Sequence, residues 1–413
     1  AVLRGAPLPP LHGLPIGIKD LEETEGVRTT WGSPIYADHV PTTDEGVVAA
    51  VRRAGAIVVG KTNVPEFGAG ANTTNPVFGP TGNPFDPARI CGGSSGGSAV
   101  AVATGMVPIA TGSDTGGSVR IPAAYCGVVG FRPSAVLIPS EKRALGWNPL
   151  AAFGPIARTV GDACLLLSAT AGHDLRDPLS HPVDPRVFRT PPSVDLARLR
   201  VALSEDLGFA PVDHAIRALF RERTRAFAGA FLSAETRPLP LERANETFEV
   251  MRAVSFVPRY KPLCDQYPDK VGPNIKANVA EGLGYTLEDV GRAHVEQTRI
   301  YRGFVQLFQE VDLLICPATA LPPFPVEQLF PTHINGEKLR TYFHWFALTY
   351  GLTLTAHPVA VVPCGLDHTG APFGLQVCGP MGADAFVLGA AAALEALFAT
   401  RAELARPIPA VTA

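Results

Sequence analysis

Three short segments near the start of the chain carry side chains suited to nucleophilic chemistry. Lys19 follows an apolar run, Ser94 and Ser95 lie in a glycine-rich segment, and Ser118 follows a pair of glycines. A serine hydroxyl becomes a nucleophile when a base takes its proton, and a lysine can be that base once burial lowers its pKa from about 10.4. The pattern therefore predicts an acyl-transfer site with Ser118 as the nucleophile and Lys19 as the base.

The glycines before Ser118 indicate how such a site would stabilise negative charge. Gly116 and Gly117 have no side chain, so backbone N–H groups can approach a substrate closely there. We also expect a short helix to begin near Ser118, and its N-terminus would add positive potential. These features together predict an oxyanion hole around the nucleophile.

A P-loop match gives a competing interpretation of this region. Residues 55–62 fit the pattern found in nucleotide-binding proteins. A phosphate-binding loop needs a strand before its first glycine and a flexible loop between the glycines, whereas the residues between Gly55 and Gly60 are themselves strand-like. The context therefore argues against nucleotide binding.

A second competing interpretation is a serine–histidine hydrolase. Residues 92–96 fit the nucleophile elbow of α/β hydrolases, but a stretch built almost wholly of Gly and Ser matches that pattern by composition alone. Of the ten histidines, His357 is the best placed because it lies in a strand-like segment. A mechanism with His357 as the base is the alternative to Lys19.

The elements that must position these residues alternate between strands and helices. Apolar or β-branched runs predict strands at 15–18, 57–59, 107–110, 313–316, 359–363 and 374–378. Spacing and end signals predict helices at 44–54, from the turn at 91–98 to Thr104, from Thr286 to about 308, and at about 384–398. This alternation predicts an α/β fold with a large, mostly parallel mixed sheet and helices on both faces. Lys19, Ser94 and Ser118 fall where strands end in loops, the place where open α/β sheets bind ligands.

Composition restricts the class of protein. The 413 residues are 46% hydrophobic and 18% charged, which is typical of a globular chain with a sizeable core. With 35 basic against 38 acidic side chains and no basic run, we expect no nucleic acid as a direct ligand. No apolar stretch is long enough for a bilayer, so we expect no membrane partner and a cytoplasmic location. The seven cysteines are scattered, which predicts buried thiols rather than a metal site.

Length and patterning predict one domain over residues 1–413. We expect its catalytic core at about 10–165 and 310–400. The part at about 180–300 is richer in Pro, Arg and Glu and less periodic, so we expect more variable surface helices and loops there. The sequence opens at Ala1 without a methionine, and we expect residues to precede it in the whole protein.

The motifs of the chain, taken together, resemble the amidase-signature family. The resemblance is carried by G-I-K-D at 17–20, G-G-S-S-G-G-S at 92–98 and G-S-D-T-G-G-S-V-R-I-P-A at 112–123. It extends through G-K-T-N at 60–63, C-G-V-V-G at 126–130, G-P-I-A-R-T-V at 154–160 and P-F-G-L-Q at 372–376. These motifs cover almost the whole chain and are weakest between about 180 and 300.

The resemblance implies a hydrolase that cleaves the C–N bond of a small-molecule carboxylic amide through an acyl-enzyme on Ser118. It implies Lys19 as the base and Ser94 as the proton relay between base and nucleophile. It also implies a cis peptide bond between Gly93 and Ser94. Neither a metal nor an organic cofactor is implied.

Further roles follow from the same resemblance. The implied oxyanion donors are the backbone N–H groups of Thr115, Gly116, Gly117 and Ser118. In the shell behind them we expect Ser95 to hydrogen-bond Lys19, and we expect Asp114 and Arg120 to brace the loop. Arg158 has two interpretations, as a ligand of a substrate carboxylate or as a structural residue.

Two other functions share these motifs. The glutaminase subunit of a tRNA-dependent amidotransferase carries all three catalytic segments. The aromatic residues at 341–346, with Phe324 and Phe330, predict an apolar acyl or aryl pocket and so favour a stand-alone amidase. A non-catalytic binding protein is disfavoured because Lys19, Ser94 and Ser118 are all present. The assembly is open, with a homodimer as one candidate.

Overall fold

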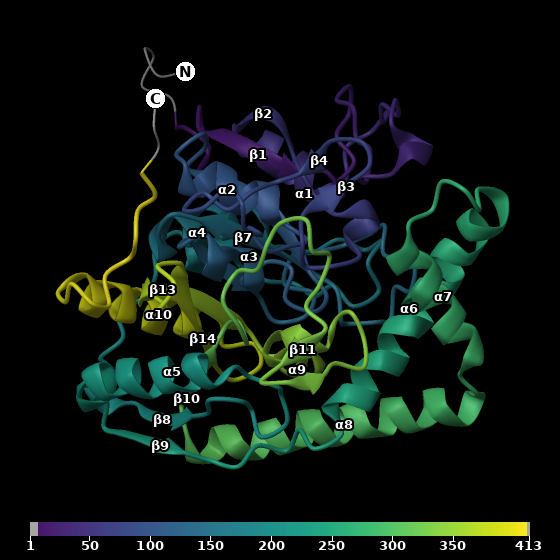
Figure 1. The fold of residues 1–413 in the computed structure, drawn as a ribbon. Coiled ribbons are helices and arrows are strands. Elements are labelled where there is room, and N and C mark those ends of the chain that lie inside the picture. The colour runs from purple at the N-terminus through teal and green to yellow at the C-terminus, as the bar shows by residue number, and fades with distance from the viewer. Residues whose placement is uncertain (1–6, 411–413) are drawn as a thin grey trace.

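A large mixed sheet organises the protein, whose computed structural model describes residues 7–410 (Figure 1). Ten strands of this part of the chain form the sheet in the order β2-β1-β5-β7-β6-β13-β14-β10-β8-β9. Their bounds in that order are Ile57–Thr62, Pro15–Lys19, Ile109–Asp114, Ala152–Ala157, Val129–Arg132, Val359–Leu366, Pro372–Cys378, Leu313–Pro317, Arg200–Leu203 and Ser233–Thr236. Two further pairs, β3 (Thr74–Asn75) with β4 (Gly79–Pro80) and β11 (His333–Ile334) with β12 (Glu337–Lys338), lie outside it.

Parallel pairs form both flanks of the sheet, and antiparallel pairs form its centre. On one flank β1 lies parallel to β2 and β5, and on the other β8 lies parallel to β10 and β9. Antiparallel pairs connect β5 through β7, β6, β13 and β14 to β10. Since β1 and β5 are parallel neighbours, their carboxyl ends meet at one edge, where Lys19 ends β1 and Asp114 ends β5.

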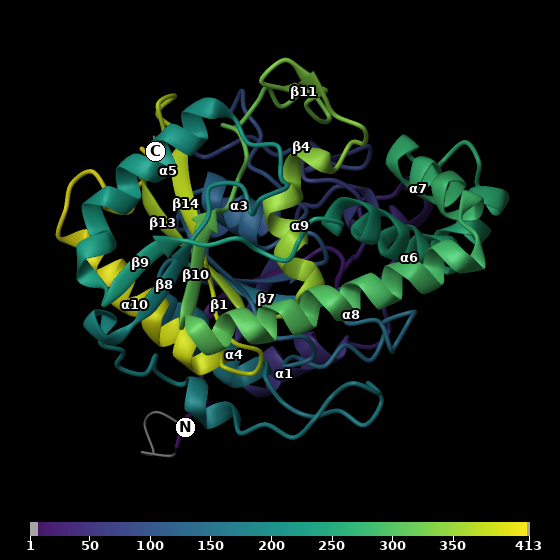
Figure 2. The same cartoon turned by 90° about the horizontal axis from the view of Figure 1, so that it is seen from below.

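Helices cover both faces of the sheet, which confirms the predicted α/β class. On one side α4 (Val160–Thr170) packs against α1 (Gly46–Arg53) and α10 (Asp384–Ala399), and on the other α2 (Gly96–Ala103) packs against α3 (Arg120–Tyr125). Figure 2 shows α1, α4 and α10 together on one side of the strands and α3 on the opposite side. The predicted helix after Thr286 is α8 (Leu287–Glu310), which begins with a capping box between Thr286 and Asp289.

The part between about 180 and 300 is more ordered than predicted. The strands β8 and β9 extend the main sheet, and α5 (His214–Phe227) packs against β10. Helix α6 (Ala244–Gln266) packs against α7 (Pro273–Gly284), α8 and α9 (Ala347–Leu354), and it buries Phe248, Met251 and Phe256. Helices and loops make up most of this part, as predicted, but the prediction missed β8 and β9 because strands of four residues are too short to show a period.

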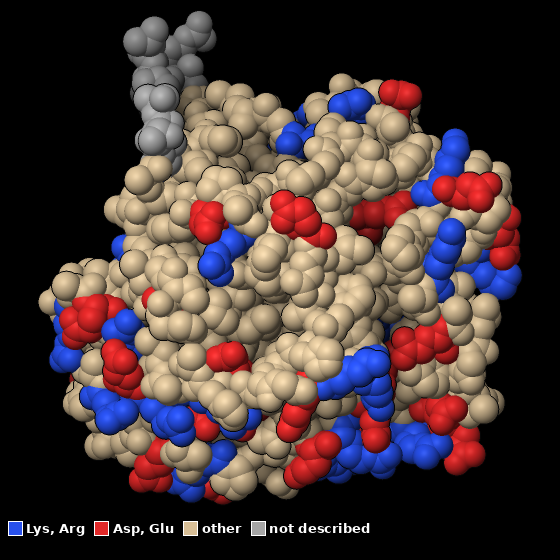
Figure 3. Space-filling view, in the orientation of Figure 1, with Lys and Arg blue, Asp and Glu red and all other residues tan. Residues whose placement is uncertain are grey.

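Charged side chains of both signs are interspersed on the surface. Figure 3 shows Lys and Arg beside Asp and Glu on the visible face, most densely over the end that carries α5 and α8. Among helices of residues 7–410, none has the length and apolar character needed to cross a membrane.

One buried carboxylate braces the loop after β5. Asp114 accepts hydrogen bonds from the N–H groups of Gly117 (2.9 Å) and Val119 (3.1 Å). It also pairs with Arg120 (2.9 Å) and Arg132 (3.2 Å), and all three charged side chains are fully buried. Burial alone would raise the pKa of Asp114, but the two guanidinium groups outweigh it and hold this pKa well below its usual range. The carboxylate therefore stays ionised and fixes the loop to α3 and β6.

Asp114→Asn should destabilise the fold strongly, because it leaves two buried arginines without their counter-charge. We expect the free energy of unfolding to fall by about 3 to 5 kcal/mol at pH 7, measured by urea denaturation. The matched control is Asp184→Asn, which breaks an exposed pair with Arg186 and should leave the free energy of unfolding almost unchanged. Because the folded pKa of Asp114 is depressed, its contribution should be complete above about pH 4 and should be lost on further acidification. Equal losses in the two variants would contradict the brace.

Candidate active site

The three segments selected from the sequence converge at the edge where β1 and β5 end. Lys19 is the last residue of β1, Ser94 lies in the turn that leads into α2, and Ser118 lies in the loop between β5 and α3. A cis peptide bond joins Gly93 to Ser94. The Ser95 N–H donates to the Ser118 carbonyl (3.1 Å), so the two serine segments are in direct contact.

Lys19 is fully buried and its ammonium group is held by serines. The Nζ atom donates to Ser94 Oγ (2.9 Å), Ser113 Oγ (3.0 Å) and the Ser113 carbonyl (3.1 Å). The prediction that Ser95 holds Lys19 is wrong, because the Ser95 hydroxyl instead lies 3.4 Å from the Ser113 carbonyl. Ser113 was missed because nothing in its local pattern marks it, although it lies inside the motif at 112–123.

The burial of Lys19 changes its acidity. Loss of hydration lowers the pKa of Lys19 to about 7, although the nearby carboxylates of Glu22 and Asp114 act to raise it. The side chain of Thr111 connects Glu22 to the backbone of Lys19. The Thr111 hydroxyl donates to Glu22 Oε2, and its oxygen accepts from the Lys19 backbone N–H (3.0 Å). A large fraction of Lys19 is therefore neutral near pH 7, as a base requires.

The loop of residues 115–118 presents its backbone to the same site. Thr115, Gly116 and Ser118 line a pocket, whereas Gly117 does not, and the Gly117 N–H already donates to Asp114. We therefore remove Gly117 from the predicted set of oxyanion donors. Thr349, in α9, fixes the loop from behind through a hydrogen bond from its hydroxyl to the Gly116 carbonyl (2.6 Å).

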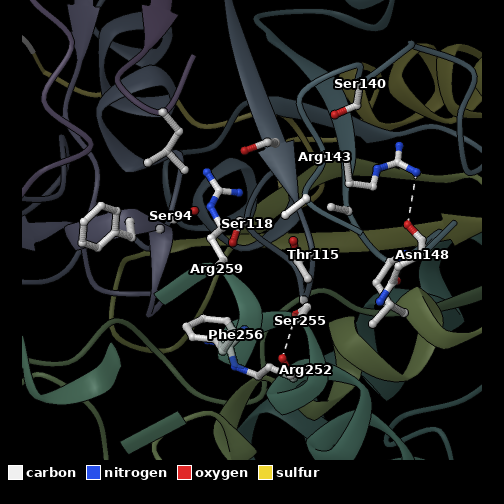
Figure 4. A pocket seen from close by; sticks show the side chains of 18 of the residues that line it. Ser94, Thr115, Ser118, Ser140, Arg143, Asn148, Arg252, Ser255, Phe256 and Arg259 are labelled. Atoms are coloured by element: carbon white, nitrogen blue, oxygen red, sulfur yellow. Dashed lines mark hydrogen bonds between the residues drawn. The ribbon is translucent and has the colours of Figure 1, made fainter. Parts of the chain in front are cut away.

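The pocket has a volume of about 310 Å³ and three walls (Figure 4). The first carries Ser94, Thr115 and Ser118, and the second carries polar residues of the segment 140–151, including Arg143 and Asn148. The third is one face of α6, formed by Arg252, Ser255, Phe256 and Arg259. Apolar side chains complete the lining: Leu21, Trp31, Phe67, Ile121, Leu145, Leu150, Phe153, Tyr260 and Phe346.

Several residues predicted to shape the pocket lie elsewhere. Of the aromatic residues proposed for an acyl or aryl pocket only Phe346 lines it, and neither Phe324 nor Phe330 does. Arg158 also lies outside the lining and is exposed. The wall on α6 was missed because its residues lie far along the chain from the catalytic motifs and follow no local pattern.

The histidine and P-loop alternatives lack structural support. His357 is buried beside Tyr301, Phe304 and Phe308 and does not line the pocket. Burial lowers the pKa of His357 to about 4. Residues 57–62 of the P-loop match form β2, so strand occupies the place of the phosphate-binding loop. Within the described chain, no group of three His, Cys, Asp or Glu side chains could hold a metal ion.

Comparison with known proteins agrees with this geometry. The family model described as Amidase matches residues 1–388. The chain is 36% identical to an acylamidase of Rhodococcus erythropolis, over 95% of the chain and 83% of that protein. It is 35% identical to a glutamyl-tRNA(Gln) amidotransferase subunit of Thermus thermophilus, over 97% and 87%.

Comparison of the fold with solved structures identifies the same family. The crystal structure of a bacterial aryl acylamidase of the amidase-signature family superposes with a TM-score of 0.87 and 29% identity, over 96% of this chain and 84% of that one. A buried lysine, two serine segments in contact and a pocket at the ends of β1 and β5 thus occur in a chain whose sequence and fold match the same enzymes. The chain belongs to the amidase-signature family, and it is an amidase, a hydrolase of carboxylic amides.

Proposed function

We propose that the chain hydrolyses its amide substrate with Ser118 as nucleophile, Ser94 as proton relay and Lys19 as base. The observation that carries the proposal is the 2.9 Å hydrogen bond between Lys19 Nζ and Ser94 Oγ, at the edge of the pocket that Ser118 lines. The lowered pKa of Lys19 supports it, because only a neutral amine can accept a proton.

The proposed reaction runs through an acyl-enzyme. Ser94 takes the proton of the Ser118 hydroxyl and passes its own to neutral Lys19 while Ser118 Oγ attacks the amide carbon. The backbone N–H groups of Thr115, Gly116 and Ser118 stabilise the resulting oxyanion. The proton then returns through Ser94 to the leaving nitrogen, the C–N bond breaks, and a water molecule attacks the ester by the same route.

We propose a stand-alone amidase that acts on amides with an acyl or aryl part. The apolar side chains of the pocket support this, since Trp31, Phe67, Phe153 and Phe346 could surround such a group. The acylamidase and aryl acylamidase relatives support it as well. A second candidate is the glutaminase component of an amidotransferase, favoured by the relatives of that name at up to 35% identity.

Three further properties are predictions from the sequence. They are a single domain over residues 1–413, a cytoplasmic location, and an open assembly with a homodimer as one candidate. Light scattering on the purified chain would measure the assembly directly.

The first test is product release by the purified chain alone from aryl, aliphatic and amino-acid amides, glutamine included. Wild type should cleave amides with apolar groups, and Ser118→Ala should abolish turnover because the acyl-enzyme cannot form. Lys19→Ala should lower kcat by at least about a hundredfold, the scale of general-base catalysis. The control His357→Asn, outside the pocket, should keep activity within about twofold. Turnover from glutamine alone would favour the amidotransferase component, and a dead His357 variant beside an active Lys19 variant would overturn the mechanism.

The second test is the pH dependence of kcat/KM for a neutral amide. Because Lys19 must lose a proton before it can act, kcat/KM should rise with pH through an apparent pKa of about 7. Glu22 raises the pKa of Lys19, so Glu22→Gln should move this rise to lower pH. A rise that stays in place or moves to higher pH in Glu22→Gln would argue that another group controls the profile.

A further inference from the structure

The charges of the side chains that line the pocket do not cancel, and positive charge is in excess. The charged side chains are Glu23, Glu45, Lys142, Arg143, Arg252 and Arg259. Glu23 pairs with Lys142, and Arg143 pairs with Asp177 outside the lining (3.5 Å). Burial, followed by the nearby charge of Glu22, raises the pKa of Glu45 to about 8, so it is mostly uncharged at pH 7. This leaves the two arginines of α6 as the uncompensated charges of the pocket.

Of the two arginines, Arg252 is buried, with only 5% of its surface exposed. Its Nε donates to Asn278 Oδ1 (3.1 Å), and its Nη2 donates to the Tyr342 hydroxyl. The guanidinium carbon lies 4.6 Å from the ring centre of Phe256, 5.4 Å from that of Phe343 and 5.5 Å from that of Tyr342. Two hydrogen bonds and three rings therefore hold the guanidinium in one orientation.

The third guanidinium nitrogen of Arg252 has no hydrogen-bond partner among the described residues. Within residues 7–410, Nη1 donates to no protein group and no carboxylate pairs with Arg252. The acid one turn earlier on α6, Glu249, is already engaged by Arg340 and by His344 (2.9 Å). A buried charge without a counter-charge is costly, and this one lines the substrate pocket.

Arg259 adds a second cation on the same face of α6. Residues 252, 255, 256 and 259 share one side of the helix. Figure 4 shows them together on one wall of the pocket, and Ser94, Thr115 and Ser118 line another wall of the same pocket. Arg259 is exposed and, in the described chain, forms no ion pair. A planar guanidinium presents parallel N–H groups that match a carboxylate better than any other common anion-binding side chain.

We infer that Arg252, assisted by Arg259, binds a carboxylate carried by the amide substrate, so that the preferred substrates are anionic amides. This inference rests on the proposed function and narrows its substrate class. The helix also sets the position of that carboxylate. A side chain at Gly116 would lie 3.0 Å from the ring of Phe248, and Arg252 follows one turn later, about 6 Å along the axis. The carboxylate should therefore lie a few bonds from the scissile carbonyl.

The kinetic test uses two matched pairs of amides that differ in one carboxylate. Succinamate with butyramide places it on the acyl side, and 4-acetamidobenzoate with acetanilide places it on the amine side. Wild type should show a kcat/KM at least tenfold higher for the anionic member of one pair. Arg252→Met should lower that preference at least tenfold, mainly through KM, and Arg252→Lys should restore part of it. Added salt should weaken the preference.

Two variants control for lost charge and lost folding. Lys261→Met removes one cation from α6 at a position outside the pocket, and it should leave the preference unchanged. Arg259→Met changes an exposed residue, so it should fold normally and still lower the preference by a few fold. Thermal melting of all variants would detect misfolding.

A binding measurement keeps the inference separate from the proposed function. Calorimetry on Ser118→Ala needs no turnover, and it should show tighter binding of one anionic amide than of its neutral partner. Combining Ser118→Ala with Arg252→Met should remove that difference. The inference is overturned if both neutral amides bind as tightly as the anionic ones, or if Arg252→Met leaves the difference intact. Hydrolysis of neutral amides that survives Ser118→Ala would overturn only the mechanism.

Discussion

The active site depends on the buried contacts of one carboxylate. Asp114 holds the loop on both sides of Ser118, through the backbone N–H groups of Gly117 and Val119, and is itself held by Arg120 and Arg132. Arg120 also donates to the Thr349 carbonyl (2.7 Å) and to Gln376 Oε1 (2.8 Å), which connects the loop to α9 and β14. Buried ion pairs add little net stability unless their hydrogen bonds are satisfied, and here most of them are. Their benefit is geometric, because the loop cannot shift without breaking contacts with four elements.

Lys19, the base of the proposed mechanism, depends on the same kind of burial. Lys19 ends β1 with its side chain fully buried, and there its Nζ donates to oxygen atoms of Ser94 and Ser113. Removing hydration lowers its pKa without any cationic neighbour. The buried end of β1 thus sets both the location and the pKa of Lys19, the proposed base, and the Asp114 brace sets the position of Ser118, the proposed nucleophile.

Sequence alone predicted what local patterns can encode. Lys19, Ser94 and Ser118 lie in short motifs whose glycines and strand ends are visible without any tertiary contact. The partner of Lys19 was assigned to Ser95 instead of Ser113, because that choice depends on how β1 and β5 pair. The engagement of the Gly117 N–H by Asp114 depends on the fold of a loop that glycines leave open.

The wall of the pocket formed by α6 was the hardest part of the site to predict from the sequence. Phe324 and Phe330 were expected in the pocket because they are aromatic, but composition does not say which aromatic residues face a cavity. Arg252 and Arg259 gave no signal, since an arginine on an amphipathic helix normally faces solvent. The packing of α6 against α7, α8 and α9 turns that face toward the pocket that Ser118 lines.

The residues of the proposed mechanism and the residues of the α6 wall lie in different segments of the chain, and this separation has a consequence for evolution. The side chains that move protons in the proposed mechanism all lie between Lys19 and Ser118, and within residues 7–410 none of the hydrogen bonds of the Lys19 side chain involves α6. A duplicated gene could therefore acquire a new substrate through point changes on one helical face while its chemistry stays intact. Among descendants of such a gene, the residues facing the pocket from α6 should diverge faster than the residues that hold Lys19 and Ser118.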